Sequence, residues 1–186
     1  MKKLKQTLIY CSVAVIAGLT GKLYPELQAS RAGIELTANK EACVRNPYQC
    51  AADVWTVGIG STAAGGEKIE QGKIYNDVEI ATRFAHDLKI AEKCVTQHFN
   101  GAKMQQRQFD AMVSLVFNVG CVGAKSYYNA KTQKREPTTL YKLAQAEQFN
   151  AMCNRITDFN RAGGKVLKGL QLRREAERKH CLGIMT

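Results

Sequence analysis

The stretch EACVRNPYQCAADVWTVGIGST, residues 41–62, decides how the first part of the chain is built. It opens with one carboxylate, Glu41, continues with cysteines at positions 43 and 50, and reaches Thr56 directly after a tryptophan. From Val54 to Gly60 the residues alternate with the period of two that is typical of a strand. One face of this strand carries mostly small residues, which leaves room for a ligand close to the backbone. The stretch therefore predicts a β element with Thr56 on its open face.

Helical patterns surround this β element. Residues 31–42 predict a helix that ends at or just after Glu41, and Asn46-Pro47 is a turn signal. Asn76, with Glu79 three residues later, predicts a capping box that opens a helix reaching about residue 95. Further along we expect helices over 109–117, from Thr138 or Thr139 to about 152, and over 168–181, with a polar loop over 125–137.

The order of these elements predicts an α+β fold. A small N-terminal lobe with β-hairpin elements is followed by a larger helical C-terminal lobe. A cleft between two such lobes is the usual position of a binding site, which would place Glu41 on one wall and Thr56 on the other.

The charge balance is strongly basic, with 27 Lys and Arg against 16 Asp and Glu and a net charge of +11. Such a surface attracts nucleic acid, anionic lipid or an anionic cell-wall polymer, and composition alone does not choose among them. The cations of the last helix fit attraction to an anionic envelope. They also fit a solvated helix face in which Arg174 pairs with a carboxylate such as Glu175 or Glu177.

The first thirty residues predict export from the cytoplasm. Lysines at the start precede an uncharged run, Gln6 to Gly21, of only 16 residues, whereas a spanning helix needs about 20. We favour an uncleaved, weakly held anchor over a signal peptide cleaved after Ala17, and the basic start would stay cytoplasmic in either case. Residues 1–30 are therefore interpreted as an anchor and linker, and residues 31–186 as the folded domain.

Seven cysteines indicate an oxidising compartment. They form no CxxC pairs and no CxxC…HxxxH pattern, so we expect no metal site, and nothing in the sequence calls for a cofactor. Cys94 and Cys121 stand near helix ends and could pair, which would leave Cys153 to pair with Cys181. Spacing alone does not prove this connectivity.

Three stretches together resemble the phage-type lysozymes, glycoside hydrolase family 24: NKEACVRNPYQCAADVWTVGIGST (39–62), FNVGC (117–121) and AGGKVLKGLQLRREAERKHC (162–181). The resemblance covers about residues 31–183 and implies a lysozyme-like catalytic domain. With the N-terminal segment included, the sequence is most similar to the signal-anchor-release (SAR) endolysin subclass. Glu41, Cys50 and Thr56 match the family's spacing of Glu, eight residues, Asp or Cys, five residues and Thr without a gap.

The resemblance implies hydrolysis of the β-1,4 bond between N-acetylmuramic acid and N-acetylglucosamine in peptidoglycan. Glu41 would be the general acid, and Cys50, where most members have Asp, would position or activate water together with Thr56. Among other carboxylates, Glu35 is expected at the surface, and Asp53 is the alternative candidate for a catalytic role. The sequence departs from the common pattern at Ala42, Val57 and Phe159, none of which removes a catalytic group.

The resemblance to SAR endolysins also implies a redox switch. A Cys43–Cys50 disulfide would consume the catalytic thiol, and Cys11, once out of the bilayer, could attack Cys43 and release Cys50. The alternative is a permanent structural disulfide between Cys43 and Cys50, which leaves Cys11 without a role.

The expected partners are peptidoglycan and, through the N-terminal segment, the host inner membrane. The protein would be tethered facing the periplasm and later soluble there, as a monomer that binds no nucleic acid and causes host lysis. The competing hypothesis is a lysozyme-like module that binds glycan without cutting it.

Overall fold

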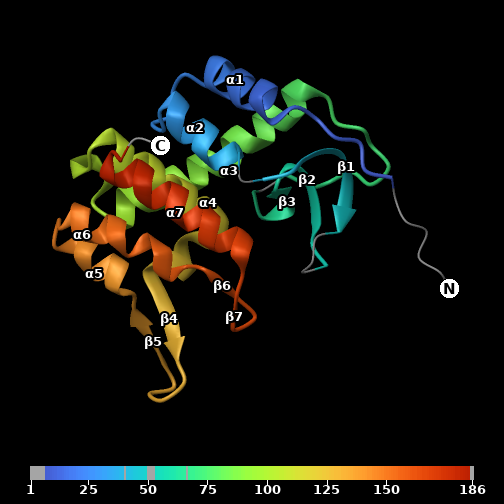
Figure 1. Ribbon diagram of the computed structural model, residues 1–186. Coiled ribbons are helices and arrows are strands. Elements are labelled where there is room, and N and C mark those ends of the chain that lie inside the picture. The colour runs from blue at the N-terminus through green and yellow to red at the C-terminus, as the bar shows by residue number, and fades with distance from the viewer. Residues whose placement is uncertain (1–6, 40, 50–52, 66, 185–186) are drawn as a thin grey trace. The chain divides into compact units, whose positions relative to one another are not determined.

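The structure is a computed structural model, and it describes residues 7–39, 41–49, 53–65 and 67–184 (Figure 1). The described chain divides into two compact units. Unit 1 comprises the residues up to Leu27 together with Ala38–Lys89, and unit 2 comprises Gln28–Thr37 together with the chain from Ile90 onward. Helices and small antiparallel sheets make up the fold, which confirms the α+β class.

A three-stranded antiparallel sheet forms the centre of unit 1. Its strands are β1 (Cys43–Gln49), β2 (Trp55–Ile59) and β3 (Ser61–Thr62), in the order β1-β2-β3. Val57 and Ile59 are completely buried. Gly58 has a φ of +62°, and a Cβ atom there would come within 2.7 Å of Ile80 Cγ2. Strand β2 therefore approaches the Ile80 side chain so closely that only glycine fits at position 58.

Two sequence predictions around Glu41 were wrong. Helix α2 spans Arg31–Ala38, so Glu41 lies beyond the helix instead of at its end. The Asn46-Pro47 pair makes no turn, because β1 continues through it with an irregular register between Val44 and Tyr48. Proline is tolerated within a strand at such an irregularity, where no ladder hydrogen bond needs its missing N–H.

Helix α1 spans Val13–Leu23 and belongs to unit 1. One of its faces is buried through Ile16, Ala17 and Thr20. The Thr20 hydroxyl donates to the Ile16 carbonyl at 2.8 Å, and the Tyr24 hydroxyl donates to Thr82 Oγ1 at 2.8 Å. Within the described parts of the chain, no helix has the length and apolar character needed to cross a membrane.

Helix α3, Asp77–His98, begins at the predicted capping box. The Asn76 N–H donates to Glu79 Oε2 at 2.9 Å, and the Glu79 N–H donates to Asn76 Oδ1 at 3.0 Å, which satisfies two backbone donors at the helix start. The helix continues to His98, one turn beyond the predicted end.

Unit 2 is mainly helical. Its main helix, α4, spans Gln106–Lys125 and bends at Gly120, whose φ of 74° is not helical. The remaining helices are α5 (Thr139–Gln145), α6 (Phe149–Asn154) and α7 (Lys168–Leu182). Thr138 caps α5 as predicted, since its hydroxyl oxygen accepts from the Tyr141 N–H at 3.0 Å. The single helix expected up to residue 152 is instead two short ones.

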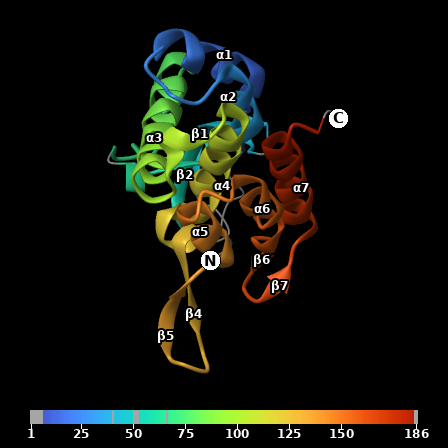
Figure 2. The same cartoon turned by 90° about the vertical axis from the view of Figure 1, so that its left-hand side faces the viewer.

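The loop predicted over residues 125–137 is a β-hairpin, which corrects that expectation. Strands β4 (Ser126–Asn129) and β5 (Lys134–Pro137) pair antiparallel and extend away from the helices of unit 2 (Figure 2). A second, smaller hairpin joins β6 (Arg161–Ala162) to β7 (Lys165–Val166). Glu136 holds the larger hairpin together by accepting hydrogen bonds from Tyr127, Asn129 and Thr132.

Disulfides and a buried ion cluster fix the helices of unit 2. The structure bonds Cys94 to Cys121 and Cys153 to Cys181. In α7, Glu177 is fully buried and pairs with Arg174 at 2.7 Å and with Arg173 at 3.1 Å. Two of the cations of this helix are therefore buried in ion pairs inside unit 2, so only the remaining cations can face a polyanion.

Asp110 is buried in α4 and ties the start of α2 to unit 2. Its carboxylate accepts from the Ser30 hydroxyl at 2.5 Å and from the Ser30 N–H at 2.9 Å. Burial alone would raise the pKa of this carboxyl, but hydrogen bonds from His180, Ser30 and Gln106 outweigh burial and lower the pKa. The contact requires glycine at position 33, where a Cβ atom would stand 2.5 Å from Asp110 Cγ.

We expect Gly33→Ala to lower the free energy of unfolding by about 1–3 kcal/mol, because the added methyl group overpacks a buried site. For a chain of this size, that loss corresponds to a fall in Tm of about 3–10 °C. Calorimetry would measure the change. Gly18→Ala is the matched control, since nothing lies within 4 Å of a Cβ at this helical position, and it should leave Tm equal or slightly higher. Equal Tm changes in the two variants would contradict this packing account.

Candidate active site

Glu41 lies in unit 1 between the end of α2 and the start of β1. Its N–H donates to the Ala38 carbonyl at 3.0 Å, which fixes the backbone just after the helix. A Cβ atom on Gly60 would lie 3.4 Å from Glu41 Oε2, so the carboxylate rests against the turn between β2 and β3. Gly60 has a φ of +69°, a conformation that a side chain would strain.

Thr56 occupies the middle of the sheet. In β2 it lies opposite Tyr48 of β1 on one side and Thr62 of β3 on the other, and its side chain is buried. The hydroxyl donates to the Val54 carbonyl at 3.1 Å. With its proton used in this way, the hydroxyl oxygen can still accept a hydrogen bond from a water molecule.

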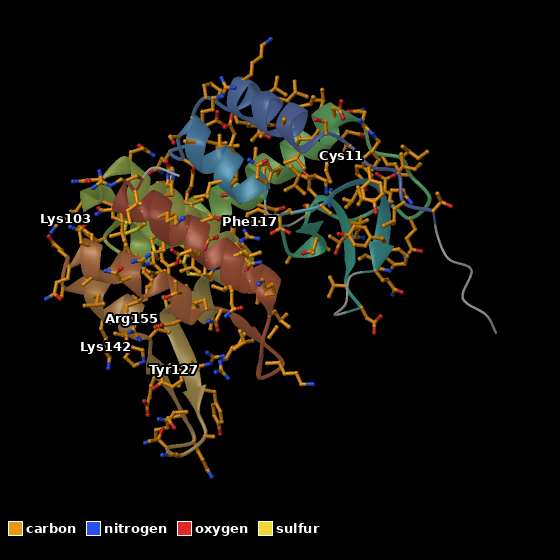
Figure 3. All side chains as sticks on the ribbon, in the orientation of Figure 1. Cys11, Lys103, Phe117, Tyr127, Lys142 and Arg155 are labelled. Carbon is orange, nitrogen blue, oxygen red and sulfur yellow. A yellow bond between two sulfur atoms is a disulfide. The ribbon has the colours of Figure 1, made fainter. Side chains whose placement is uncertain are left out.

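Cys50 lies outside the described residues, so the structure gives no position for the thiol expected there. It does give the partner of the neighbouring cysteine, since Cys43 is bonded to Cys11 (Figure 3). Because a sulfur atom forms one disulfide at a time, the alternative of a Cys43–Cys50 disulfide is not the pairing in this structure.

Two other carboxylates that the sequence raised differ in their surroundings. Glu35 is partly exposed and pairs with Arg31 at 2.9 Å within α2. Asp53 is exposed in the segment before β2, with a left-handed φ of 56°. Glu41 is the carboxylate that the structure places against the turn beside the Thr56 strand.

Asp87 was missed by the sequence analysis. It supports β3, the strand that pairs with the Thr56 strand β2. It accepts a side-chain hydrogen bond from Ser61 in β3, and a Cβ atom on Gly65 would collide with its carboxylate. Burial raises the pKa of the Asp87 carboxyl, an effect partly offset by the Ser61 hydrogen bond and the charge of Arg83. The available signal was its spacing, because Asp87 stands seven residues after the buried Ile80 and so shares the apolar face of α3.

In the described part of the chain, no group of three or more His, Cys, Asp or Glu side chains is arranged to hold a metal ion.

Sequence comparison shows which family shares these features. The phage lysozyme family model matches residues 38–177. The SAR-endolysin of Haemophilus phage HP1 (strain HP1c1) is 47% identical over 189 residues, covering 98% of this chain and 100% of that protein.

Comparison with solved structures separates two forms of one relative. The active form of P1 phage endolysin Lyz has a TM-score of 0.87 and 38% identity, covering 94% of this chain and 95% of that one. The secreted inactive form of the same endolysin has a TM-score of 0.54 and 38% identity, covering 66% and 78%. The fold of this chain is thus more similar to the active form.

The raised pKa of Asp87 predicts a pH-dependent stability. A carboxyl whose pKa is higher in the folded state contributes stability below its ordinary pKa, and this stability is lost as the pH rises through the folded value. Asp87→Asn, which cannot ionise but can still accept from Ser61, should therefore have a higher Tm than the wild type near pH 7. The difference should shrink towards about pH 3 in thermal melts across this range. A Tm difference that does not change with pH would show that ionisation of Asp87 is not involved.

Proposed function

Because this chain belongs to the phage lysozyme family, and within it to the SAR-endolysins, we propose that it hydrolyses the β-1,4 bond between N-acetylmuramic acid and N-acetylglucosamine in peptidoglycan. It is a lysozyme-type hydrolase with an endolysin's lytic function. The choice of bond rests on the family match. The observation that supports the choice of residues most directly is the position of the Glu41 carboxylate beside Gly60, in the turn that follows the Thr56 strand.

Glu41 is the proposed general acid. The oxygen that leaves the sugar must receive a proton as positive charge develops on the ring, and a carboxylic acid beside the bond can supply it. Glycine at position 60 favours this role, since a side chain there would point at the Glu41 carboxylate and glycine leaves that space open.

Thr56 and Cys50 are proposed to hold and activate the water that attacks the sugar. A water molecule that donates to the Thr56 hydroxyl oxygen keeps a lone pair for the attack. The resemblance to phage-type lysozymes implies that most members have Asp where this sequence has Cys50, and a thiol with a pKa of about 8.5 is partly ionised near neutral pH. Cys50 can therefore act as a base or as a second anchor for the water.

We further propose that the partner of Cys43 switches the enzyme. While the N-terminal segment is in the bilayer, Cys43 is bonded to Cys50 and the site lacks its thiol. After release, Cys11 forms a disulfide with Cys43, and Cys50 becomes a free thiol. The Cys11–Cys43 bond in the structure supports this order, as does the greater similarity to the active form of the P1 endolysin.

The proposed location follows from the same scheme. The weak anchor tethers the monomer to the host inner membrane facing the periplasm, and the released enzyme is soluble in the periplasm, next to its substrate. The net charge of +11 supports attraction to the anionic cell wall.

We expect Glu41→Gln to reduce peptidoglycan hydrolysis about 10²–10⁴-fold, because an amide cannot deliver the proton. Turbidity loss of purified cell walls measures the rate, and Tm shows whether the variant is folded. Glu35→Gln is the matched control and should keep wild-type activity, since Glu35 pairs with Arg31 at the surface of α2. Comparable hydrolysis by the folded Glu41→Gln protein would contradict the role of Glu41 as the acid, whereas a wild type without any hydrolysis would leave only a glycan-binding module.

Cys50→Asp tests the switch and the water-holding role together. A carboxylate can accept hydrogen bonds from the water, but it cannot form a disulfide with Cys43. The variant should therefore hydrolyse cell walls equally well before and after mild reduction, while Cys50→Ala should be impaired in both conditions. If the oxidised Cys50→Asp protein still required a reductant, the Cys43–Cys50 lock would be the wrong explanation of inactivity.

A further inference from the structure

The N-terminal segment adds to the outer edge of β1 as a short extra strand. Tyr10 pairs antiparallel with Val44. The Cys11 N–H donates to the Cys43 carbonyl at 3.0 Å, and the Arg45 N–H donates to the Ile9 carbonyl at 2.6 Å. Figure 1 shows the dark-blue segment that leads into α1 running beside β1. The cysteine pair is therefore part of a hydrogen-bonded ladder.

One hydrogen bond of a regular antiparallel pairing is missing between the N-terminal segment and β1. In a regular antiparallel pair, Ile9 and Arg45 would exchange both hydrogen bonds, and the Ile9 N–H would donate to the Arg45 carbonyl. That carbonyl instead accepts from the Tyr75 N–H at 2.9 Å. The next residue of β1 that could donate on this edge is Pro47, which has no N–H.

The side chain of Asn46 replaces the missing backbone partners. The Ile9 N–H donates to Asn46 Oδ1 at 2.8 Å, and Asn46 Nδ2 donates to the Thr7 carbonyl at 3.0 Å. The carboxamide thus acts as a surrogate peptide group, with one acceptor and one donor facing the segment. Asn46 is only 8% exposed, so loss of either hydrogen bond would leave a buried polar group unsatisfied.

We propose that Asn46 is a positioning residue for the disulfide exchange, because it fixes the register in which the released N-terminal segment adds to β1. This register places Cys11 beside Cys43. A slip of one residue would turn the Cys11 side chain to the opposite face of the strand pair. The proposal rests on the proposed function, since it explains how the attacking thiol finds its target.

The exchange that Asn46 would guide is balanced without any outside oxidant. The Cys11 thiolate attacks Cys43 Sγ, the Cys11–Cys43 bond forms, and the Cys43–Cys50 bond breaks. Cys50 leaves as a thiolate and takes up a proton according to its pKa. In the product, Cys43 is 2% exposed, so thiols in solution have little access to reverse the step.

The test uses the full chain in mixtures of reduced and oxidised glutathione, with acid quenching, alkylation and mass mapping of each cysteine pair. We expect Asn46→Ala to lower the equilibrium constant for forming the Cys11–Cys43 bond about tenfold, from the loss of two hydrogen bonds that hold the register. Asn46→Asp should fall between the two proteins, because it can still accept from the Ile9 N–H but cannot donate to Thr7.

Two controls separate positioning from general loosening of the fold. The Cys94–Cys121 and Cys153–Cys181 bonds of the same molecules should keep their wild-type equilibria, because they lie in unit 2. Gln171→Ala, which removes an exposed carboxamide from α7, should leave all three bonds unchanged.

A Cys11–Cys43 equilibrium that is the same in Asn46→Ala and wild type would overturn the proposal, and so would an equal weakening of all three bonds. The switch itself is read separately, as the appearance of a Cys43–Cys50 bond in the membrane-tethered wild type. If that bond never forms, the proposed switch fails, while the glutathione equilibrium still decides whether Asn46 sets the register.

Discussion

Cys43 can share its sulfur with one other cysteine at a time, and it stands two residues after Glu41 at the first position of β1. In this structure its partner is Cys11, so the disulfide joins the N-terminal segment to the strand that follows the proposed acid. The same segment continues into α1. In the proposed switch, the partner of Cys43 connects the position of the N-terminal segment to the chemistry of the site.

The proposed release from the membrane needs an N-terminal helix that suits two environments, and α1 is only moderately apolar. Small residues such as Ala17 and Gly18 make it a weak span. In the folded protein, Ile16 and Ala17 are buried within unit 1, and the Thr20 hydroxyl donates a hydrogen bond to the Ile16 carbonyl. A longer and more apolar helix would stay in the bilayer, and a more polar one would have no apolar face to bury.

Local signals in the sequence predicted those elements whose cause is local. The Asn76 capping box, the Thr138 cap and the last basic helix were all found, because each depends on residues within one or two turns. The β4–β5 hairpin was missed because Glu136 organises it through polar side chains, so its strands lack an apolar period of two.

The arrangement around β1 depends on partners distant in the chain. Asn46 and Pro47 look like a turn in isolation, but residues 7–11 and Tyr75 supply hydrogen bonds that hold this part of the chain as a strand. The spacing of Glu41 and Thr56 could be recognised from the sequence. The spacing of Asp87 could place it on the apolar face of α3, but its hydrogen bond with Ser61 of β3 could not be predicted, because it depends on how α3 packs on the sheet.

The most direct test is to map the partner of Cys43 in membrane-tethered and released protein, with thiols trapped by alkylation, and to assay peptidoglycan hydrolysis by the same two fractions. The account predicts a Cys43–Cys50 bond and no hydrolysis in the tethered fraction, and a Cys11–Cys43 bond with hydrolysis in the released fraction. The same Cys43 partner in both fractions, or hydrolysis by protein whose Cys43 is bonded to Cys50, would contradict it.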